Sequence, residues 1–348
     1  MDSKQILMEL CEINAPSGFE APAAQAALAL LRPLTDEVYI DRMGSVLGVR
    51  RCGRETAKTL LLDAHLDEIG LVVTGAEEGF LRFSAIGGVD PRMLPNRELT
   101  ILTDPPLFGV VACLPPHIQT KESARKASAI EELYIDIGMT QEAAERAVPI
   151  GTPVVFRAPC TPLGEGQLCG KAMDDRSCFA ALLRTLDILR EETLDVDLYV
   201  MGSTREEVSG AGAKTGTFAV APDCCVAVDV THGATPDAPK SKTFAIGGGP
   251  AVGVGPNMTA WMTARMRETA KQAGIPIRLE VMGGSSGTNG WHMQISREGV
   301  ATSVLSLPLK YMHSPVETLA LSDLEALAQL LAAFVRSMGE EGEPCSIP

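Results

Sequence analysis

The feature that most limits the fold of this chain is the alternation of apolar strands and helices that begins after Gly170. Strands are predicted at residues 194–203 and 223–230, and long helices at residues 174–192 and 322–339. Such alternation is typical of a mostly parallel sheet, because each helix carries the chain back across the sheet to the next strand. We therefore predict a three-layer α/β fold in which helices cover both faces of one sheet.

A segment of different texture interrupts this pattern. Residues 74–163 form short apolar runs separated by Gly and Pro, with one helical pattern in "TQEAAERAV". Many short strands with turn signals between them predict a small β-barrel or sandwich. The economical organisation is one α/β domain built from residues 1–73 and 164–348, into which residues 74–163 are inserted as a separate β-rich domain.

The bulk properties exclude several classes of protein. The 348 residues carry 30 Lys and Arg against 44 Asp and Glu, a net charge of −14. The chain therefore lacks the basic surface that binding to nucleic acid or to an anionic membrane requires. It has no run of about 18 apolar residues and no pattern of a signal peptide. Its nine scattered Cys are expected to be reduced thiols, so we expect a cytoplasmic protein.

Acidic and imidazole side chains stand where the predicted strands of the α/β domain end. Five separate strand ends or loops carry such groups, and the residues concerned are His65, Asp67, Asp174, Asp175, Glu206, Glu207, Asp229 and His313. Because ligands of parallel sheets bind outside the carboxyl ends of the strands, we expect these groups to converge. Any one of them has an ordinary structural explanation, but converging carboxylates repel and are costly to desolvate. A divalent cation removes that cost.

The types of ligand indicate which metal is bound and how many ions. Two imidazoles with three carboxylates suit Zn²⁺, Co²⁺ or Mn²⁺, whereas Ca²⁺ and Mg²⁺ prefer oxygen alone. Five ligands exceed the three that one catalytic zinc typically uses, so we expect two ions that share one carboxylate and hold a water between them. Glu207 is expected to bind metal and Glu206 to be the base for the water. Asp67 is expected to orient the ring of His65.

Five motifs, taken in order, resemble those of one family. They are "DAHLDEIG", "GKAMDDRS", "EEVSGAGA", "VDVTHGATPD" and "YMHSPVE". Together they resemble the glutamyl-aminopeptidase or TET-aminopeptidase family, which is metallopeptidase family 42 of the dinuclear zinc exopeptidases. The resemblance implies that His65 and Asp229 hold one metal ion and that Glu207 and His313 hold the other. It also implies that Asp174 bridges the two ions.

The resemblance further implies a function and an assembly. The chain would be an aminopeptidase that releases N-terminal residues from small peptides, with Glu206 as general base and Asp67 as the residue that orients a ligand. Zinc would be the most favoured metal, with cobalt or manganese as alternatives. The bond between Asp174 and Asp175 would be cis. The inserted domain would pair subunits or act as a lid, with dimers building a hollow dodecamer.

Three departures from the family pattern leave the substrate preference open. Asn289 stands where an Asp is usual, Cys178 where Gly is common, and His232 lies beside the proposed ligand Asp229. The residues also leave other functions open. A related metal-dependent deacylase or carboxypeptidase-like amidohydrolase would use the same metal pair, and a glycoside hydrolase would use two carboxylates without metal. A scaffold without activity that assembles through the inserted domain is the remaining alternative.

Overall fold

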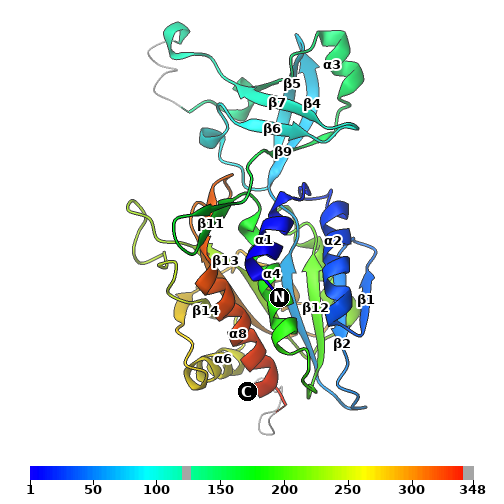
Figure 1. Ribbon diagram of the computed structural model, residues 1–348, viewed down its shortest axis with the longest axis vertical. Coiled ribbons are helices and arrows are strands. Elements are labelled where there is room, and N and C mark those ends of the chain that lie inside the picture. Colours follow the sequence, from blue (N-terminus) through cyan, green and yellow to red (C-terminus); the bar gives the residue numbers. More distant parts are fainter. Residues whose placement is uncertain (120–126, 340–348) are drawn as a thin grey trace.

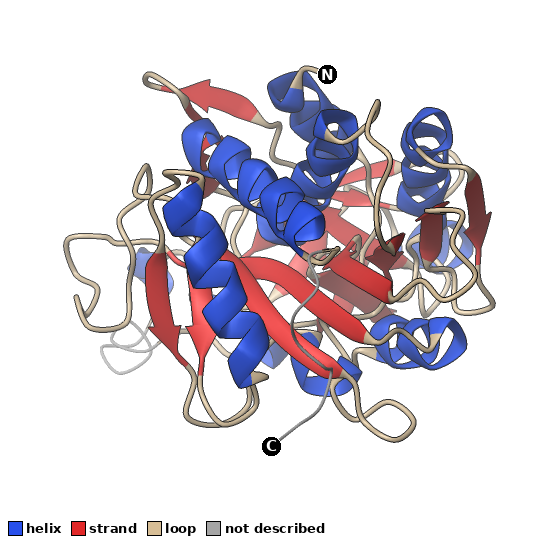
Figure 2. Cartoon of the chain, turned by 90° about the horizontal axis from the view of Figure 1, so that it is seen from below, coloured by secondary structure: helices blue, strands red, loops and turns tan. Residues whose placement is uncertain are grey.

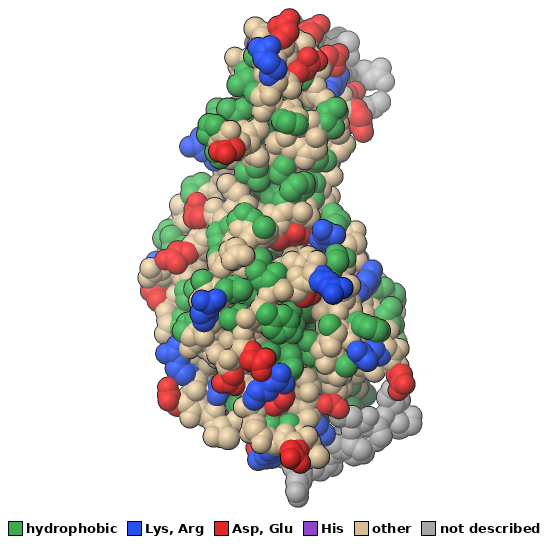
Figure 3. Space-filling model, turned by 90° about the vertical axis from the view of Figure 1, so that its right-hand side faces the viewer, with side chains coloured by type: hydrophobic (Ala, Val, Ile, Leu, Met, Phe, Trp, Pro, Cys, Tyr) green, Lys and Arg blue, Asp and Glu red, His purple; other side chains and the backbone are tan. Residues whose placement is uncertain are grey.

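The computed structural model describes residues 1–119 and 127–339. These residues form an α/β part and a small β-barrel that are joined at a narrow waist (Figure 1). On the face drawn in Figure 3, hydrophobic side chains gather around that waist, while charged side chains are scattered over the rest of the surface. This arrangement confirms the predicted fold class, an α/β layered fold with an inserted β-barrel or sandwich.

One sheet of eight strands forms the middle layer of the α/β part. In order across the sheet, its strands are β1 (Glu37–Ile40), β2 (Val46–Arg50), β12 (Asp197–Ser203), β3 (Thr59–His65), β13 (Cys224–His232), β16 (Ala301–Leu309), β14 (Ala251–Val254) and β15 (Arg278–Val281). The four central strands, β12, β3, β13 and β16, run parallel to one another. Their carboxyl ends therefore share one edge of the sheet, where ligands of such folds bind.

Helices cover both faces of this sheet (Figure 2). One face packs against α1 (Ser3–Glu12), α2 (Ala21–Leu31), α4 (Met173–Ile188), α6 (Ala260–Gln272) and α8 (Leu321–Ser337), and the other against α5 (Ala211–Val220) and α7 (Gly290–Met293). Leu60 and Leu62 of β3 join the first core and Leu61 joins the second. Successive side chains of a strand point to opposite faces, so a continuous apolar run fills both layers.

The inserted barrel closes from six strands. Its neighbours in order are β4 (Gly70–Glu77), β5 (Phe80–Ile86), β8 (Tyr134–Asp136), β7 (Leu107–Ala112), β6 (Glu98–Ile101) and β9 (Pro153–Phe156). The helix α3 (Gln141–Ala147) packs on β4 and β5, and Leu71, Leu99 and Ile135 are among the residues of a separate apolar core. The sequence left a barrel and a sandwich open, and the closed barrel decides between them. The predicted domain limits of 74–163 remain a proposal.

A small sheet and four short helical turns complete the described elements. The sheet is antiparallel and consists of β10 (Thr161–Leu163), β11 (Gln167–Gly170) and β17 (Glu317–Ala320). The 3₁₀ turns are η1 (Arg32–Leu34), η2 (Pro91–Met93), η3 (Pro116–Ile118) and η5 (Ile130–Glu132). This sheet positions the site, because β11 is followed closely by α4 and β17 lies between His313 and α8.

The structure bears on two predictions, that the cysteines are reduced thiols and that no segment spans a membrane. The eight described cysteines form no disulfides with one another, and Cys345 lies outside the described residues. Within residues 1–119 and 127–339, no helix combines the length and the apolar character needed to span a bilayer. The cytoplasmic location remains a prediction from the sequence.

Candidate metal centre

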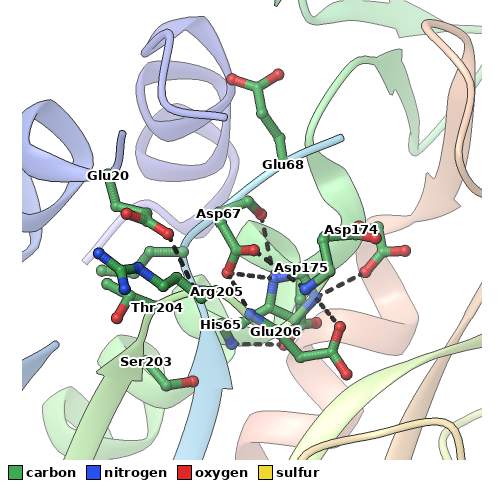
Figure 4. Close-up of polar contacts among 12 residues, drawn as sticks. Glu20, His65, Asp67, Glu68, Asp174, Asp175, Ser203, Thr204, Arg205 and Glu206 are labelled. Atoms are coloured by element: carbon green, nitrogen blue, oxygen red, sulfur yellow. Dashed lines mark hydrogen bonds and ion pairs between the residues drawn. The ribbon is translucent and has the colours of Figure 1, made fainter. Parts of the chain in front are cut away.

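The carboxyl ends of the parallel strands bring the predicted site residues into one pocket. β3 ends at His65, Asp229 lies on β13, and the remaining groups follow β12 and β16 or open α4. A cavity of about 400 Å³ is lined by the six expected metal ligands and base, namely His65, Asp174, Glu206, Glu207, Asp229 and His313. Figure 4 shows how His65, Asp174 and Glu206 lie together beside Asp67.

Asp174 lies between the two imidazoles. Its Oδ1 is 3.1 Å from Nε2 of His65, and its Oδ2 is 3.3 Å from Nε2 of His313. Burial by itself would raise the pKa of Asp174, but the hydrogen bonds and charges of the two imidazoles hold this pKa well below its usual range. Asp174 is therefore a carboxylate with one oxygen directed to each imidazole. Its peptide bond to Asp175 is cis, as the family resemblance implied.

Further carboxylates accompany each imidazole. Oε2 of Glu207 is 3.4 Å from Nε2 of His313. Around His65, donor atoms of Asp175 and Asp229 lie within 4.8 Å of one another and of the ring. Together with the central carboxylate, these contacts unite all five predicted metal ligands. Asp175 is an addition, since the sequence gave it no role, and its Oδ2 also accepts a hydrogen bond from the backbone N–H of His65 at 3.2 Å.

The donor set fits a divalent metal centre. Burial raises the pKa of Glu207 well above its usual value, and negative charge on Asp174 adds to this shift. Burial likewise raises the pKa of Asp229, with negative charge on Glu206 adding to it. Carboxylates crowded in this way are unfavourable without a cation. Imidazole nitrogens mixed with carboxylate oxygens are ligands of Zn²⁺, Co²⁺ and Mn²⁺ rather than of Ca²⁺ or Mg²⁺.

Glu206 faces the same pocket without belonging to these ligand clusters. Its Oε2 is 4.0 Å from Nε2 of His65, and its side chain is 16% exposed. Burial, reinforced by the charges of Asp174 and Asp67 and opposed by the imidazoles, raises the pKa of Glu206 to about 7. A carboxyl group at the wall of an open pocket, with a pKa near neutrality, is suited to general base catalysis.

Asp67 contacts both His65 and the two glutamates. Its Oδ1 accepts a hydrogen bond from the backbone N–H of Glu206 and its Oδ2 accepts one from Glu207, each at 3.1 Å. Its Oδ1 is also 3.4 Å from Nδ1 of His65, but the backbone carbonyl of Asp67 lies closer to that nitrogen, at 3.1 Å. The carboxylate expected to orient the ring therefore also holds the backbone that carries the expected base.

Comparison with known proteins identifies the family. A family model described as M42 glutamyl aminopeptidase matches residues 44–330. The chain belongs to the M42 glutamyl aminopeptidase family. Over 341 residues this M42 peptidase is 32% identical to the lysyl aminopeptidase of Pyrococcus furiosus. The alignment covers 96% of this chain and 97% of that relative.

Solved structures agree with this assignment. Aminopeptidase APDkam598 of the archaeon Desulfurococcus kamchatkensis has a TM-score of 0.89 at 32% identity and covers 96% of this chain and 94% of its own. The TET1 peptidase of Pyrococcus horikoshii has a TM-score of 0.85 at 28% identity, and the match covers 96% of this chain and 99% of that one. This relative is described as assembling into a tetrahedron or a large octahedral shell. The M42 peptidase is thus a peptide hydrolase, as its motifs predicted, and its family implies divalent metal ions at the cluster.

Sequence reasoning gave no role to Glu317 of the M42 peptidase. The side chain is 2% exposed and accepts hydrogen bonds from the backbone N–H groups of Met173, Asp174 and His313. The sequence shows that Glu317 ends the motif "YMHSPVE". It does not show that β17 pairs with β11, and this pairing brings Glu317 to α4. The structure thus adds a buried carboxylate that contacts two of the predicted ligand segments.

A buried ionic network supports the segment that follows His65, the first predicted histidine ligand of the M42 peptidase. Both oxygens of Glu68 lie 2.9 Å from Nζ of Lys171, and one lies 3.2 Å from the guanidinium of Arg176. Arg176 is fully buried and also donates to the carbonyl of Leu66 at 3.0 Å. In the sequence, this network could have been suspected from Lys171 and Arg176, which flank the two acidic residues of "GKAMDDRS".

The three departures from the family pattern occupy different places in the M42 peptidase. Asn289 is buried and donates to Asp63 at 2.8 Å and to Ser203 at 2.9 Å. Cys178 is buried in α4. Of the three, His232 alone is among the described residues that line the cavity. A direct effect on substrate preference is therefore expected from His232 before the other two.

Proposed function

We propose that this M42 peptidase is a dinuclear aminopeptidase that hydrolyses the first peptide bond of small peptides. The observation that carries the proposal is the position of Asp174, whose two oxygens each approach one imidazole at 3.1 and 3.3 Å. A carboxylate placed in this way can serve two ions at once. The names of the relatives, among them a lysyl aminopeptidase, support removal of N-terminal residues.

The proposed ligand sets follow from the contacts. His65 and Asp229 would hold one ion, Glu207 and His313 the other, and Asp174 both. Zinc is the most favoured metal for these donors, with cobalt or manganese as alternatives. When bound, two such ions polarise the scissile carbonyl and make a water in the site more acidic.

Glu206 is the proposed general base. Its carboxylate, held at the pocket wall by the Asp67 contact to its backbone, takes a proton from the attacking water at Oε2. The same carboxyl group then gives the proton to the nitrogen of the leaving amine, so that no net proton remains on the enzyme. The acidic lining of the pocket also favours a substrate with a free, positively charged N-terminus.

We further propose that the chain assembles as a homo-oligomer, with dimers building to a dodecamer. The inserted domain, proposed as residues 74–163, would pair subunits or act as a lid. The TET1 relative, described as assembling into a tetrahedron or a large octahedral shell, supports this proposal. So do large apolar side chains exposed on this domain, including Phe108 (51%) and Ile150 (76%). Light scattering of the purified protein tests the assembly.

The function is tested with a matched set of substrates. Peptides with a free N-terminus, the same peptides with an acetylated N-terminus, and cello-oligosaccharides are incubated with protein before and after chelation. We expect cleavage of the free peptides alone, lost on chelation and restored by zinc or cobalt. Cleavage of only the acetylated peptides would establish the deacylase alternative, and chelator-resistant cleavage of sugars the glycosidase. No hydrolysis of any peptide by the metal-loaded protein would favour a scaffold.

A further inference from the structure

We propose that Glu317 is a positioning residue that fixes the segment of His313 against the segment of Asp174. In this way it sets the affinity for the ion held by His313 and Glu207. The inference rests on the proposed function, because it uses the assignment of these residues to metal. Glu317 is the first residue of β17 and is not among the residues that line the cavity, so it acts through other residues.

One carboxylate joins backbone groups from two distant segments. Oε1 of Glu317 accepts a hydrogen bond from the backbone N–H of His313 at 2.9 Å. Oε2 accepts hydrogen bonds from the backbone N–H groups of Met173 at 2.8 Å and Asp174 at 3.2 Å. Each oxygen holds a different segment, so the width of the carboxylate sets the distance between them.

Both segments have backbones that require such support. His313 has a φ of +60° and Ala172 a φ of +57°, in the left-handed region that is unfavourable for residues other than glycine. Asp174 and Asp175, which follow Met173 in α4, also depart from helical φ and ψ. The N–H groups of Met173 and Asp174 both donate to Glu317, which thereby holds this irregular backbone in place.

Glu317 is itself held by a fixed backbone. The register of β17 against β11 places it opposite Gly170, shortly before the start of α4. Next to it, Thr318 and Lys310 exchange two backbone hydrogen bonds of 2.9 and 3.0 Å. The side chain is 2% exposed, so water does not compete for its oxygens. A rigid carboxylate of this kind determines where both ligand segments lie.

The first test compares zinc binding by wild type, Glu317→Gln and the control Glu325→Gln. Glu325 lies on α8 and contacts Ser3 and Arg184, outside the cavity lining. Zinc is titrated into each metal-free full-length protein against a competing chelator. The amide keeps the shape of Glu317, but its NH₂ group faces a backbone N–H, so one segment loses its acceptor.

We expect one of the two zinc-binding steps of Glu317→Gln to lose about 10–100-fold in affinity, as is common for groups that support metal ligands. The other step should change less, excess zinc should restore full occupancy, and the control should match wild type. Unchanged binding in Glu317→Gln would overturn the proposal, and so would an equal loss at both steps, which a general structural role predicts.

The second test uses amide hydrogen exchange of the metal-free protein and needs neither zinc nor activity. The backbone N–H of His313 should exchange slowly in wild type, because its acceptor is a buried carboxylate. In Glu317→Gln, faster exchange is expected either at His313 or at Met173 and Asp174, according to which segment the NH₂ group faces. Rapid exchange of the His313 N–H in wild type would overturn the proposal even if the variant does not fold. A wild type that binds a single zinc ion would contradict the dinuclear function, whereas the exchange result would still decide the role of Glu317.

Discussion

The carboxylate of Asp67 accepts a hydrogen bond from the backbone N–H of Glu206, with 3.1 Å between Oδ1 and the nitrogen. The residue before it, Arg205, has a φ of +59°, so this turn adopts a backbone that needs external support. The oxygen Oε1 of Glu20 supplies part of it by accepting the N–H of Arg205 at 3.0 Å. The position of the proposed base thus depends on buried carboxylates from two other segments.

Replacing Asp67 by Asn is expected to lower kcat by about 10–100-fold with little change in KM. The amide cannot accept from both glutamate N–H groups, so the segment of Glu206 shifts. Kinetics on an aminoacyl p-nitroanilide measure the effect. Asp41→Asn is the matched control, since Asp41 also accepts two backbone N–H groups, at 2.8 and 2.9 Å, but in the β1–β2 hairpin. Equal losses in both variants would contradict a role specific to the site.

The adjacent glutamates should respond differently to the same substitution. Glu206→Gln removes the proposed base and is expected to lower kcat by roughly 10²–10⁴-fold while the metal content stays at the wild-type value. Glu207→Gln removes a proposed ligand, so it should lower the metal content. Elemental analysis beside single-turnover kinetics separates the two effects. Loss of metal from Glu206→Gln would show that the two roles are assigned wrongly.

Removal of metal should destabilise the protein through Asp174. A ligand present at 1,000 times its Kd stabilises the folded state by about 4 kcal/mol, so chelation should lower Tm by several degrees. Asp174→Ala lacks the carboxylate that approaches both imidazoles, and we expect it to bind little metal. Its Tm should be insensitive to zinc. Differential scanning calorimetry with metal analysis checks this, and a normal zinc-dependent rise in Tm would exclude a bridging role.

The pH dependence of stability should differ between the metal-free and metal-loaded protein. Burial raises the pKa of Asp63 and of Glu206 to about 7. At pH 6 the folded protein therefore retains protons that the unfolded chain has released. Its free energy of unfolding should fall by about 1 kcal/mol per group as the pH rises from 6 to 8. Bound cations favour the ionised carboxylates near them, so the metal-loaded protein should lose less. A metal-free protein that becomes more stable over this range would contradict the prediction.

Much of the fold was predictable because its signals are local. The apolar run from Leu60 to Leu62 is buried on both faces, and the helix and strand alternation after Gly170 gives the parallel sheet. Several short strands were missed for a local reason as well, and β14 and β17 are two examples. β14, "AVGV", contains Gly and follows a Gly-rich run, and β17, "ETLA", merges with the start of α8. Neither is long enough for its periodicity to be recognised.

The sequence predicted which residues form the candidate site, but it did not predict the residues that hold them in place. His65 ends the buried strand β3 and Asp229 lies within the buried strand β13, and an acidic or imidazole group on an apolar run is a pattern that a sequence displays. The contact of Glu317 with Asp174 depends on the register between β11 and β17, which no local pattern fixes. The same holds for the contact of Gly88 with His313, since these residues are 225 positions apart and belong to different parts of the fold.

That contact makes Gly88 a sensitive position of the barrel. Its carbonyl lies 3.2 Å from Nδ1 of His313, and a Cβ at Gly88 would lie only 2.5 Å from the same nitrogen. Gly88→Ala should therefore displace the ring and lower both activity and metal affinity by about 10–100-fold. Gly75→Ala is the control, because a Cβ on Gly75 of β4 would meet no atom within 4 Å. Tm and metal affinity of both variants measure the effect. Wild-type affinity in Gly88→Ala would mean that His313 tolerates the methyl group and that the barrel does not constrain the site.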